Sequence, residues 1–274
     1  MFFTESDIQQ YSNVTFKLIE THQEGNLFNI TLNRPEKRNA FTPTMLQELA
    51  FALAFAHYNK EIWCVLIEAK GSIFCAGMDL MVFQNPLLDV ENTTLPKPLK
   101  EITLGDAFKF LEKPCIAKVQ GSVFAGGFLI IGGCNFVISV EDVLFGLPEV
   151  KRGIFPMQVM ATLFKIMPQR KAIEMAILGK NYTANEAYSL GLVTQISTKE
   201  NIEHDTKELI SSILENSPLA ISKGLEAMNK LQNLPENEQH QYLLGILQEI
   251  KNSMDAKEGI LAFKEKRKPN WLNK

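Results

Sequence analysis

The sequence predicts an α/β fold with a helical C-terminal region, and two patterns along its 274 residues support this prediction. In the first two-thirds, short apolar segments typical of buried strands alternate with segments of helical periodicity, as in a layered α/β core. In the last third only helical segments follow one another. We therefore expect an α/β core over residues 1–197 and a helical cap or association region over residues 198–274.

Caps and breakers set the expected ends of several elements. Thr42 and Pro43 suit the N-cap and first position of a helix, and Gly191 suits the end of another. Strands are predicted at residues 27–32, 63–68, 115–119 and 193–196, with a strand pair before residue 148. Helices are predicted at residues 43–57, 103–111, 158–167, 171–178, 184–190, 201–215, 218–232, 236–254 and 256–266, with short ones after residues 79 and 125.

One long connection stands out between these elements. Residues 85–98 contain three prolines among polar residues, which predicts a mobile loop of the kind that often serves as a lid.

Composition excludes several classes of function. The chain is 46% hydrophobic and carries a net charge of -3, so neither nucleic acid nor an anionic membrane is expected as the main partner. The start lacks the features of a signal peptide and no apolar run reaches 18 residues, so we expect a cytoplasmic protein without membrane association. The four cysteines have no CxxC spacing, and no histidine has a second ligand at metal spacing, so we predict buried thiols and no metal.

The segment from Lys113 to Pro156 carries the chemistry. An apolar strand leads to the small residues Ala125, Gly126 and Gly127, which open an apolar helix. Such a junction directs backbone N–H groups and a positive dipole end toward one point, where developing negative charge can bind. A strand pair and the single carboxylate Glu149 follow.

Four stretches, in order, resemble the crotonase (enoyl-CoA hydratase/isomerase) superfamily. They are NRPEKRNAF at residues 33–41, FCAGMDL at 74–80, the segment 113–156 with its AGG turn and FGLPEVKRGIFP, and EGILAFKEKRKPNW at 258–271. The resemblance implies a spiral of ββα turns with a helical C-terminal trimerisation region, and assembly as a homotrimer or homohexamer. It also implies an acyl-CoA thioester as substrate, with coenzyme A belonging to the substrate and no separate cofactor.

The resemblance further implies a backbone oxyanion hole that stabilises a thioester enolate. Its two N–H donors fall on Met78 and Gly126. Hydratases of the family use two glutamates. One of them is present here as Glu149, while Leu129 occupies the position of the other.

A single carboxylate favours Δ3,Δ2-enoyl-CoA isomerisation, in which one base moves a proton from C2 to C4. Hydration by Glu149 alone is the alternative. The neighbouring Lys151 and Arg152 are either solvated or lower the pKa of Glu149.

Coenzyme A contacts are implied at residues of three stretches, and Asp79 also suits a helix N-cap. These positions are Lys37, Arg38, Ala40, Ala76, Asp79, Leu80, Phe263 and Lys266, the last two often reaching a neighbouring subunit in relatives.

Other functions of the same scaffold stay open at this point. Thioester hydrolysis or dehalogenation would need a second acid, and Glu141 and Asp142 fall at a predicted surface turn. A non-catalytic homologue that binds CoA or RNA is a different class. Its basic candidate is the KEKRK stretch at 264–268, which also belongs to the terminal motif.

Overall fold

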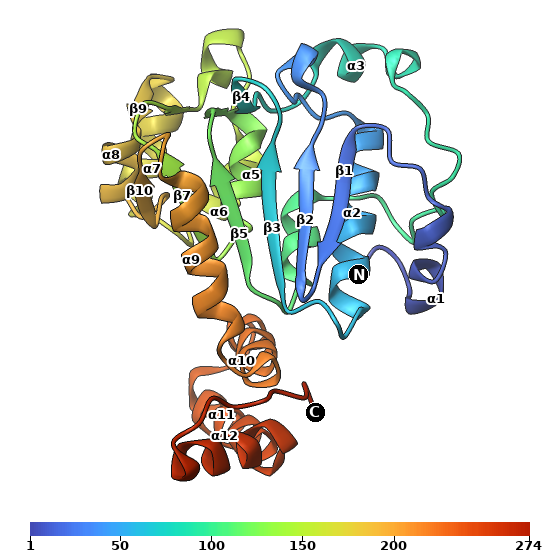
Figure 1. Cartoon of the computed structure of the whole chain (residues 1–274). Coiled ribbons are helices and arrows are strands. Elements are labelled where there is room, and N and C mark those ends of the chain that lie inside the picture. Colours follow the sequence, from blue (N-terminus) through green and yellow to red (C-terminus); the bar gives the residue numbers. More distant parts are fainter.

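The computed structural model describes residues 1–274 and contains two β-sheets surrounded by helices (Figure 1). The strands are β1 Ile19–Glu24, β2 Leu27–Leu32, β3 Cys64–Ala69, β4 Ile73–Cys75, β5 Cys115–Val119, β6 Ser122–Phe124, β7 Phe136–Val140, β8 Leu144–Gly146, β9 Asn181–Thr183 and β10 Gln195–Ser197.

The α-helices are α1 Glu5–Ile8, α2 Pro43–Tyr58, α3 Leu80–Gln84, α4 Leu104–Lys109, α5 Phe128–Ile131, α6 Met157–Leu163, α7 Gln169–Leu178, α8 Ala184–Ser189, α9 Ile202–Leu214, α10 Pro218–Leu231, α11 Glu236–Asn252 and α12 Met254–Glu265. Short 3-10 helices are η1 Tyr11–Asn13, η2 Pro35–Lys37, η3 Pro86–Leu88, η4 Ala125–Gly127 and η5 Pro148–Arg152.

The larger sheet has six strands in the order β1-β2-β3-β5-β7-β10. Only the β1–β2 hairpin is antiparallel, and the other pairs are parallel. Along β2 every second residue is buried, and helix α2 covers that face while α9 lies on the other (Figure 1). The core therefore lies between α2 and the sheet, as alternating burial requires.

The smaller sheet has four strands in the order β4-β6-β8-β9. The strands β4, β6 and β8 are parallel, and each follows a strand of the larger sheet after a short connection. Each pair then leads into a helical segment, so the unit of two strands and a helix repeats along the chain. This arrangement confirms the predicted spiral of ββα turns.

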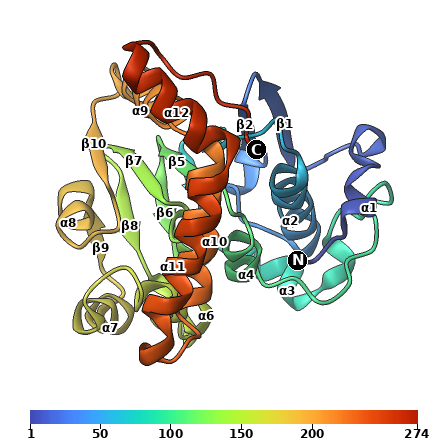
Figure 2. The same ribbon diagram turned by 90° about the horizontal axis from the view of Figure 1, so that it is seen from below.

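The last three helices form a bundle that extends away from the sheets at the lower end of Figure 1. Figure 2, from below, shows α10 and α11 side by side beneath the core. The side-chain amide of Asn229 on α10 donates to the carbonyl of Lys109 on α4 at 3.0 Å, which ties the bundle to the core. No helix in the structure is both long enough and apolar enough to span a membrane.

The loop at residues 85–98, predicted to be mobile, is fastened by buried polar contacts. Asn92 is buried, and its amide donates to a carboxylate oxygen of Glu48 on α2 at 2.6 Å and to the carbonyl of Thr15. The fully buried Glu48 also accepts hydrogen bonds from the backbone N–H groups of residues 17–19. One carboxylate therefore joins the start of β1, helix α2 and this loop.

Most predicted elements are confirmed within a few residues, but four strands were missed and the predicted strand at 193–196 lies at β10. Strands β4, β6 and β9 have three residues each, too short for an alternating pattern to appear in the sequence. Strand β1 has only one buried residue, Ile19, because its outer face and the edge of the sheet are polar.

Candidate active site

The candidate site lies where three neighbouring parallel strands end. Strands β4, β6 and β8 end at Cys75, Phe124 and Gly146, and adjacent strands in this set pair in parallel. Because the carboxyl ends of parallel strands meet at one edge of a sheet, the segments that follow them come together there. Those segments carry Met78, Gly126 and Glu149.

Met78 presents a free backbone N–H. Gly77 accepts from the N–H of Phe41 at 2.8 Å, and Asp79 donates to the carbonyl of Phe41 at 3.0 Å. Successive peptide groups of an extended chain point to opposite sides, so the Met78 amide faces away from Phe41. It donates to no protein acceptor.

Gly126 is the second residue of η4, so its N–H has no acceptor within that helical segment. The segment begins at Ala125 in the left-handed region, with φ of 52°. A Cβ atom at Gly126 would lie 2.5 Å from the Phe41 ring, so any larger residue would require that ring to move. A Cβ at Gly77 would lie 2.8 Å from the Gly126 nitrogen, which places the Gly77–Met78 peptide beside the Gly126 amide.

Glu149 is a half-buried carboxylate on η5. Its Oε2 atom is buried and has no hydrogen-bond partner. Burial raises the pKa of Glu149, and its own backbone N–H and the charge of Arg152 oppose that shift without reversing it. The side chains of Lys151 and Arg152 are exposed to solvent, so the pKa is raised despite them.

Neither Leu129, which the resemblance aligns with a second glutamate, nor Asp79 offers a free carboxylate. Leu129 on α5 is 5% exposed and lies among core residues. The carboxylate of Asp79 pairs with Arg34 at 2.7 Å and accepts from the backbone N–H groups of Met81 and Val82. Asp79 is therefore the N-cap of α3, which confirms that expectation.

The loop at residues 34–41 is held against the segment after β4. Buried Asn39 donates to the carbonyls of Lys70 and Ile73, and the Cys75 thiol donates to the Asn39 carbonyl at 3.2 Å. The N–H of Ala76 donates to the carbonyl of Arg38. These contacts gather most of the positions assigned to coenzyme A into one region: Lys37, Arg38, Ala40, Ala76, Asp79 and Leu80.

Phe263 and Lys266 are not part of that region within one chain. Phe263 is 85% exposed on α12, and Lys266 is the C-cap of the same helix. Helix α12 packs on α10 and α11, at the opposite end of the molecule from α3 (Figure 1).

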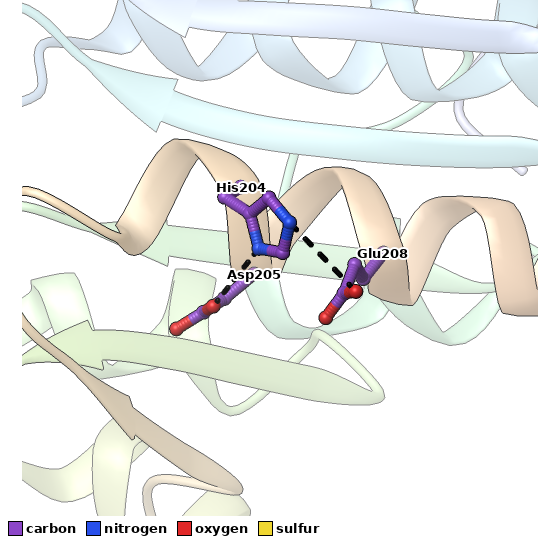
Figure 3. A group of neighbouring side chains, drawn as sticks. All are labelled: His204, Asp205 and Glu208. Carbon is purple, nitrogen blue, oxygen red and sulfur yellow. Dashed lines mark ion pairs between the residues drawn. The ribbon is translucent and has the colours of Figure 1, made fainter.

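His204 has neighbouring ligand atoms, which the sequence reasoning missed. His204, Asp205 and Glu208 gather on α9 (Figure 3), with Nδ1 3.5 Å from Asp205 and Nε2 3.8 Å from Glu208. The statement that no histidine has a second ligand at metal spacing is therefore wrong, and the four-residue spacing of His204 and Glu208 was the available signal. The group is largely exposed and lies on a different element from the site above.

Sequence reasoning also missed the residues that hold the two free amides in position. Arg34, Asn39, Phe41 and Gly77 fix the two free amides through contacts described above. A signal existed for Asn39 and Gly77, because asparagine and glycine tolerate the positive φ of 51° and 88° found there.

Comparisons with known proteins agree with the architecture. A family model described as enoyl-CoA hydratase/isomerase matches residues 22–274. The enoyl-CoA hydratase EchA19 of Mycobacterium tuberculosis is 32% identical over 256 residues, which cover 92% of this chain and 95% of that protein. The mevalonyl-coenzyme A hydratase sidH of Aspergillus fumigatus is 28% identical over 245 residues, covering 88% and 90%.

Solved structures have the same fold. The crystal structure of an enoyl-CoA hydratase from Mycobacterium tuberculosis H37Rv aligns with a TM-score of 0.81 and 28% identity, covering 94% of this chain and 99% of that one. With a family model matching nearly the whole sequence and this fold, the chain belongs to the enoyl-CoA hydratase/isomerase (crotonase) family.

Proposed function

We propose that this protein isomerises the double bond of a 3-enoyl-CoA to the 2-enoyl-CoA, with Glu149 as its only acid–base residue. The proposal is carried by the half-buried carboxylate of Glu149, whose Oε2 atom has no hydrogen-bond partner, on the segment that follows β8. The two free backbone amides lie on the segments that follow the neighbouring strands β4 and β6, and Leu129 stands where a second glutamate would be expected. Members of this family act on acyl-CoA thioesters, and that class of substrate is the starting point.

The amides of Met78 and Gly126 bind the thioester oxygen in this proposal. Removing the C2 proton turns the carbonyl into an enolate, and the negative charge develops on that oxygen. Two preformed N–H donors stabilise it more than they stabilise the neutral carbonyl, which lowers the barrier. Because both donors are fixed by the Phe41 bridge and the Gly77–Gly126 contact, they need no reorganisation during the reaction.

Glu149 then transfers one proton from C2 to C4 of the substrate, with no net uptake or release of protons. Its carboxylate takes the proton from C2, the electron pair delocalises over C2, C4 and the carbonyl oxygen, and the same carboxylic acid returns the proton at C4. Burial supports this role, because a raised pKa makes Glu149 a stronger base than a solvated glutamate.

Hydration is the second candidate, and the names of the relatives favour it. Both curated relatives described above are called hydratases. In this alternative Glu149 alone would activate water for attack at C3 and also deliver the proton to C2. One carboxylate would then perform the work of two, which is why we place isomerisation first.

Coenzyme A is proposed to bind along the loop at residues 34–41. Lys37 and Arg38 are exposed cations at its tip, and cations suit the phosphates of the nucleotide. Phe263 and Lys266 would complete the adenine site from a neighbouring subunit, because α12 lies far from this loop within one chain. A homotrimer or homohexamer would provide that neighbour.

The reaction is tested by incubating the protein with 3-hexenoyl-CoA and crotonyl-CoA in parallel. We expect 3-hexenoyl-CoA to become 2-hexenoyl-CoA and crotonyl-CoA to stay unhydrated. The absorbance of the conjugated thioester measures both reactions. Glu149→Gln should lower kcat by about 10²–10⁴-fold, the usual contribution of a positioned acid–base residue.

Glu141→Gln, at an exposed position in a turn, is the matched control and should keep wild-type turnover. Hydration of crotonyl-CoA without isomerisation would replace isomerase with hydratase. Inertness toward both substrates would favour a specialised substrate or a binding role, and full activity of Glu149→Gln would rule out Glu149 as the base.

The geometry of the amides is tested by Gly77→Ala. The added Cβ would meet the Gly126 nitrogen at 2.8 Å and the Ala125 Cβ at 2.7 Å, so the Gly126 amide must shift. We expect kcat to fall by about 10²-fold, near the lower end of the loss measured for one oxyanion donor. Steady-state kinetics with 3-hexenoyl-CoA measures this.

Gly25→Ala separates that effect from backbone strain. Gly25 also has a positive φ, but nothing lies within 4 Å of its added Cβ. The control should lose about 1–2 kcal/mol of stability and keep its kcat. Equal losses of kcat in the two variants would contradict the role of the Gly77–Gly126 contact.

The charge of Arg152 is expected to modify the pH dependence of activity, which burial of Glu149 dominates. Glu149 accepts a proton only when ionised, so activity is lost as pH falls through its raised pKa. Arg152 lowers that pKa, and Arg152→Gln removes the opposing charge. The acidic limb of the kcat/KM profile should therefore move to higher pH. Lys151→Gln should leave the pH of the acidic limb unchanged. An acidic limb at the same or a lower pH in Arg152→Gln would contradict this account.

A further inference from the structure

Two of the four cysteines lie in contact, one at the start of β5 and the other after the end of α5. The Sγ atoms of Cys115 and Cys134 are 3.4 Å apart. Cys115 is the first residue of β5, and Cys134 follows the end of α5, so the two belong to elements on either side of Gly126 in the chain. Cys64 and Cys75 are buried, and the hydrogen bonds of their thiols go to backbone groups and not to another thiol.

The backbone holds this pair in position. The N–H of Asn135 donates to the carbonyl of Cys115 at 2.8 Å, and the Asn135 side-chain oxygen accepts from the N–H of Cys115 at 2.9 Å. Ile116 and Phe136 then begin the parallel ladder of β5 with β7. Asn135 is therefore level with Cys115, and the residue before it, Cys134, brings its Sγ atom to 3.4 Å from that of Cys115.

The two sulfur atoms differ in access. Cys115 is 1% exposed, whereas Cys134 is only partly buried, so Cys134 is the more accessible residue of the two. Burial, together with the neighbouring Cys134 sulfur, raises the pKa of the Cys115 thiol, so Cys115 stays protonated. This asymmetry separates an attacking sulfur from a resolving one.

We propose that Cys134 and Cys115 form a reversible dithiol–disulfide pair that hydrogen peroxide oxidises. The sulfur of Cys134 attacks one peroxide oxygen, the O–O bond breaks, and the departing hydroxide takes the thiol proton of Cys134, so that sulfenic acid and one water form. The sulfur of Cys115 then attacks the sulfenic sulfur, the S–O bond breaks, and the departing hydroxide leaves as water with the Cys115 proton. Two thiols and one peroxide give one disulfide and two waters, with two electrons passing from sulfur to oxygen.

The position gives the modification a local consequence. The disulfide would close a loop from Cys115 to Cys134 that contains β6, η4 and α5, and with them Gly126. Oxidation would thereby restrain the segment that carries one of the two free amides. The proposal rests on the thiol geometry and is independent of the reaction proposed above.

Mass spectrometry of the full-length protein tests the pair. The protein is treated with hydrogen peroxide, its free thiols are alkylated under denaturing conditions, and the peptides are mapped. We expect the mass of the protein to fall by two hydrogen atoms and the peptides that contain Cys115 and Cys134 to be cross-linked within one chain. Dithiothreitol should reverse the cross-link fully. Cys64 and Cys75 should remain alkylated in the same sample.

Two variants sharpen the result. Cys134→Ser should leave Cys115 reduced under the same treatment, while Cys64→Ala should form the disulfide as the wild type does. Circular dichroism verifies that each variant is folded, and the wild-type map decides the question by itself. Sulfinic acid at Cys134 with Cys115 still reduced, a disulfide between chains, or two unreacted thiols would each overturn the proposal.

Discussion

The contact between Gly77 and Gly126 is the constraint on which the candidate site depends. A Cβ on Gly77 would lie 2.8 Å from the Gly126 nitrogen and 2.7 Å from the Ala125 Cβ, so no side chain fits at Gly77 without a shift of the backbone. The contact joins the segment after β4 to the segment after β6, and the bridge between Phe41 and Met78 adds the loop after β2. Three separate turns of the chain are thereby locked around two amides that have no other acceptor.

Burial of Glu149 belongs to the same arrangement. The third parallel strand, β8, leads into η5 at the edge of the sheet where the other segments end, and the Oε2 atom of Glu149 is left without a hydrogen-bond partner. A buried carboxylate oxygen without a hydrogen-bond partner costs stability, and such costs are concentrated at functional sites. Sequence neighbours alone would suggest the opposite environment, since two cations follow Glu149, but their side chains extend into solvent.

Several features that depend on neighbouring residues in the sequence were predicted correctly. The helix opened by Thr42 and Pro43, and strands β2, β3 and β5, follow from capping and apolar periodicity, and the order of the four motifs indicated the family. Contacts between segments that are distant in the sequence could not be predicted from it. The hydrogen bond between Glu48 and Asn92 and the packing of Gly77 on Gly126 produce no periodic pattern in the sequence. The pKa direction of Glu149 likewise depends on burial, which only the fold decides.

The central claim is that the amides of Met78 and Gly126 polarise a thioester carbonyl. The most direct test is the infrared stretching frequency of a carbon-13-labelled carbonyl in butyryl-CoA, measured free in water and bound to the protein. Two converging N–H donors weaken the C=O bond, so we predict a lower frequency in the bound state. A bound carbonyl that absorbs at or above its frequency in water would contradict the account.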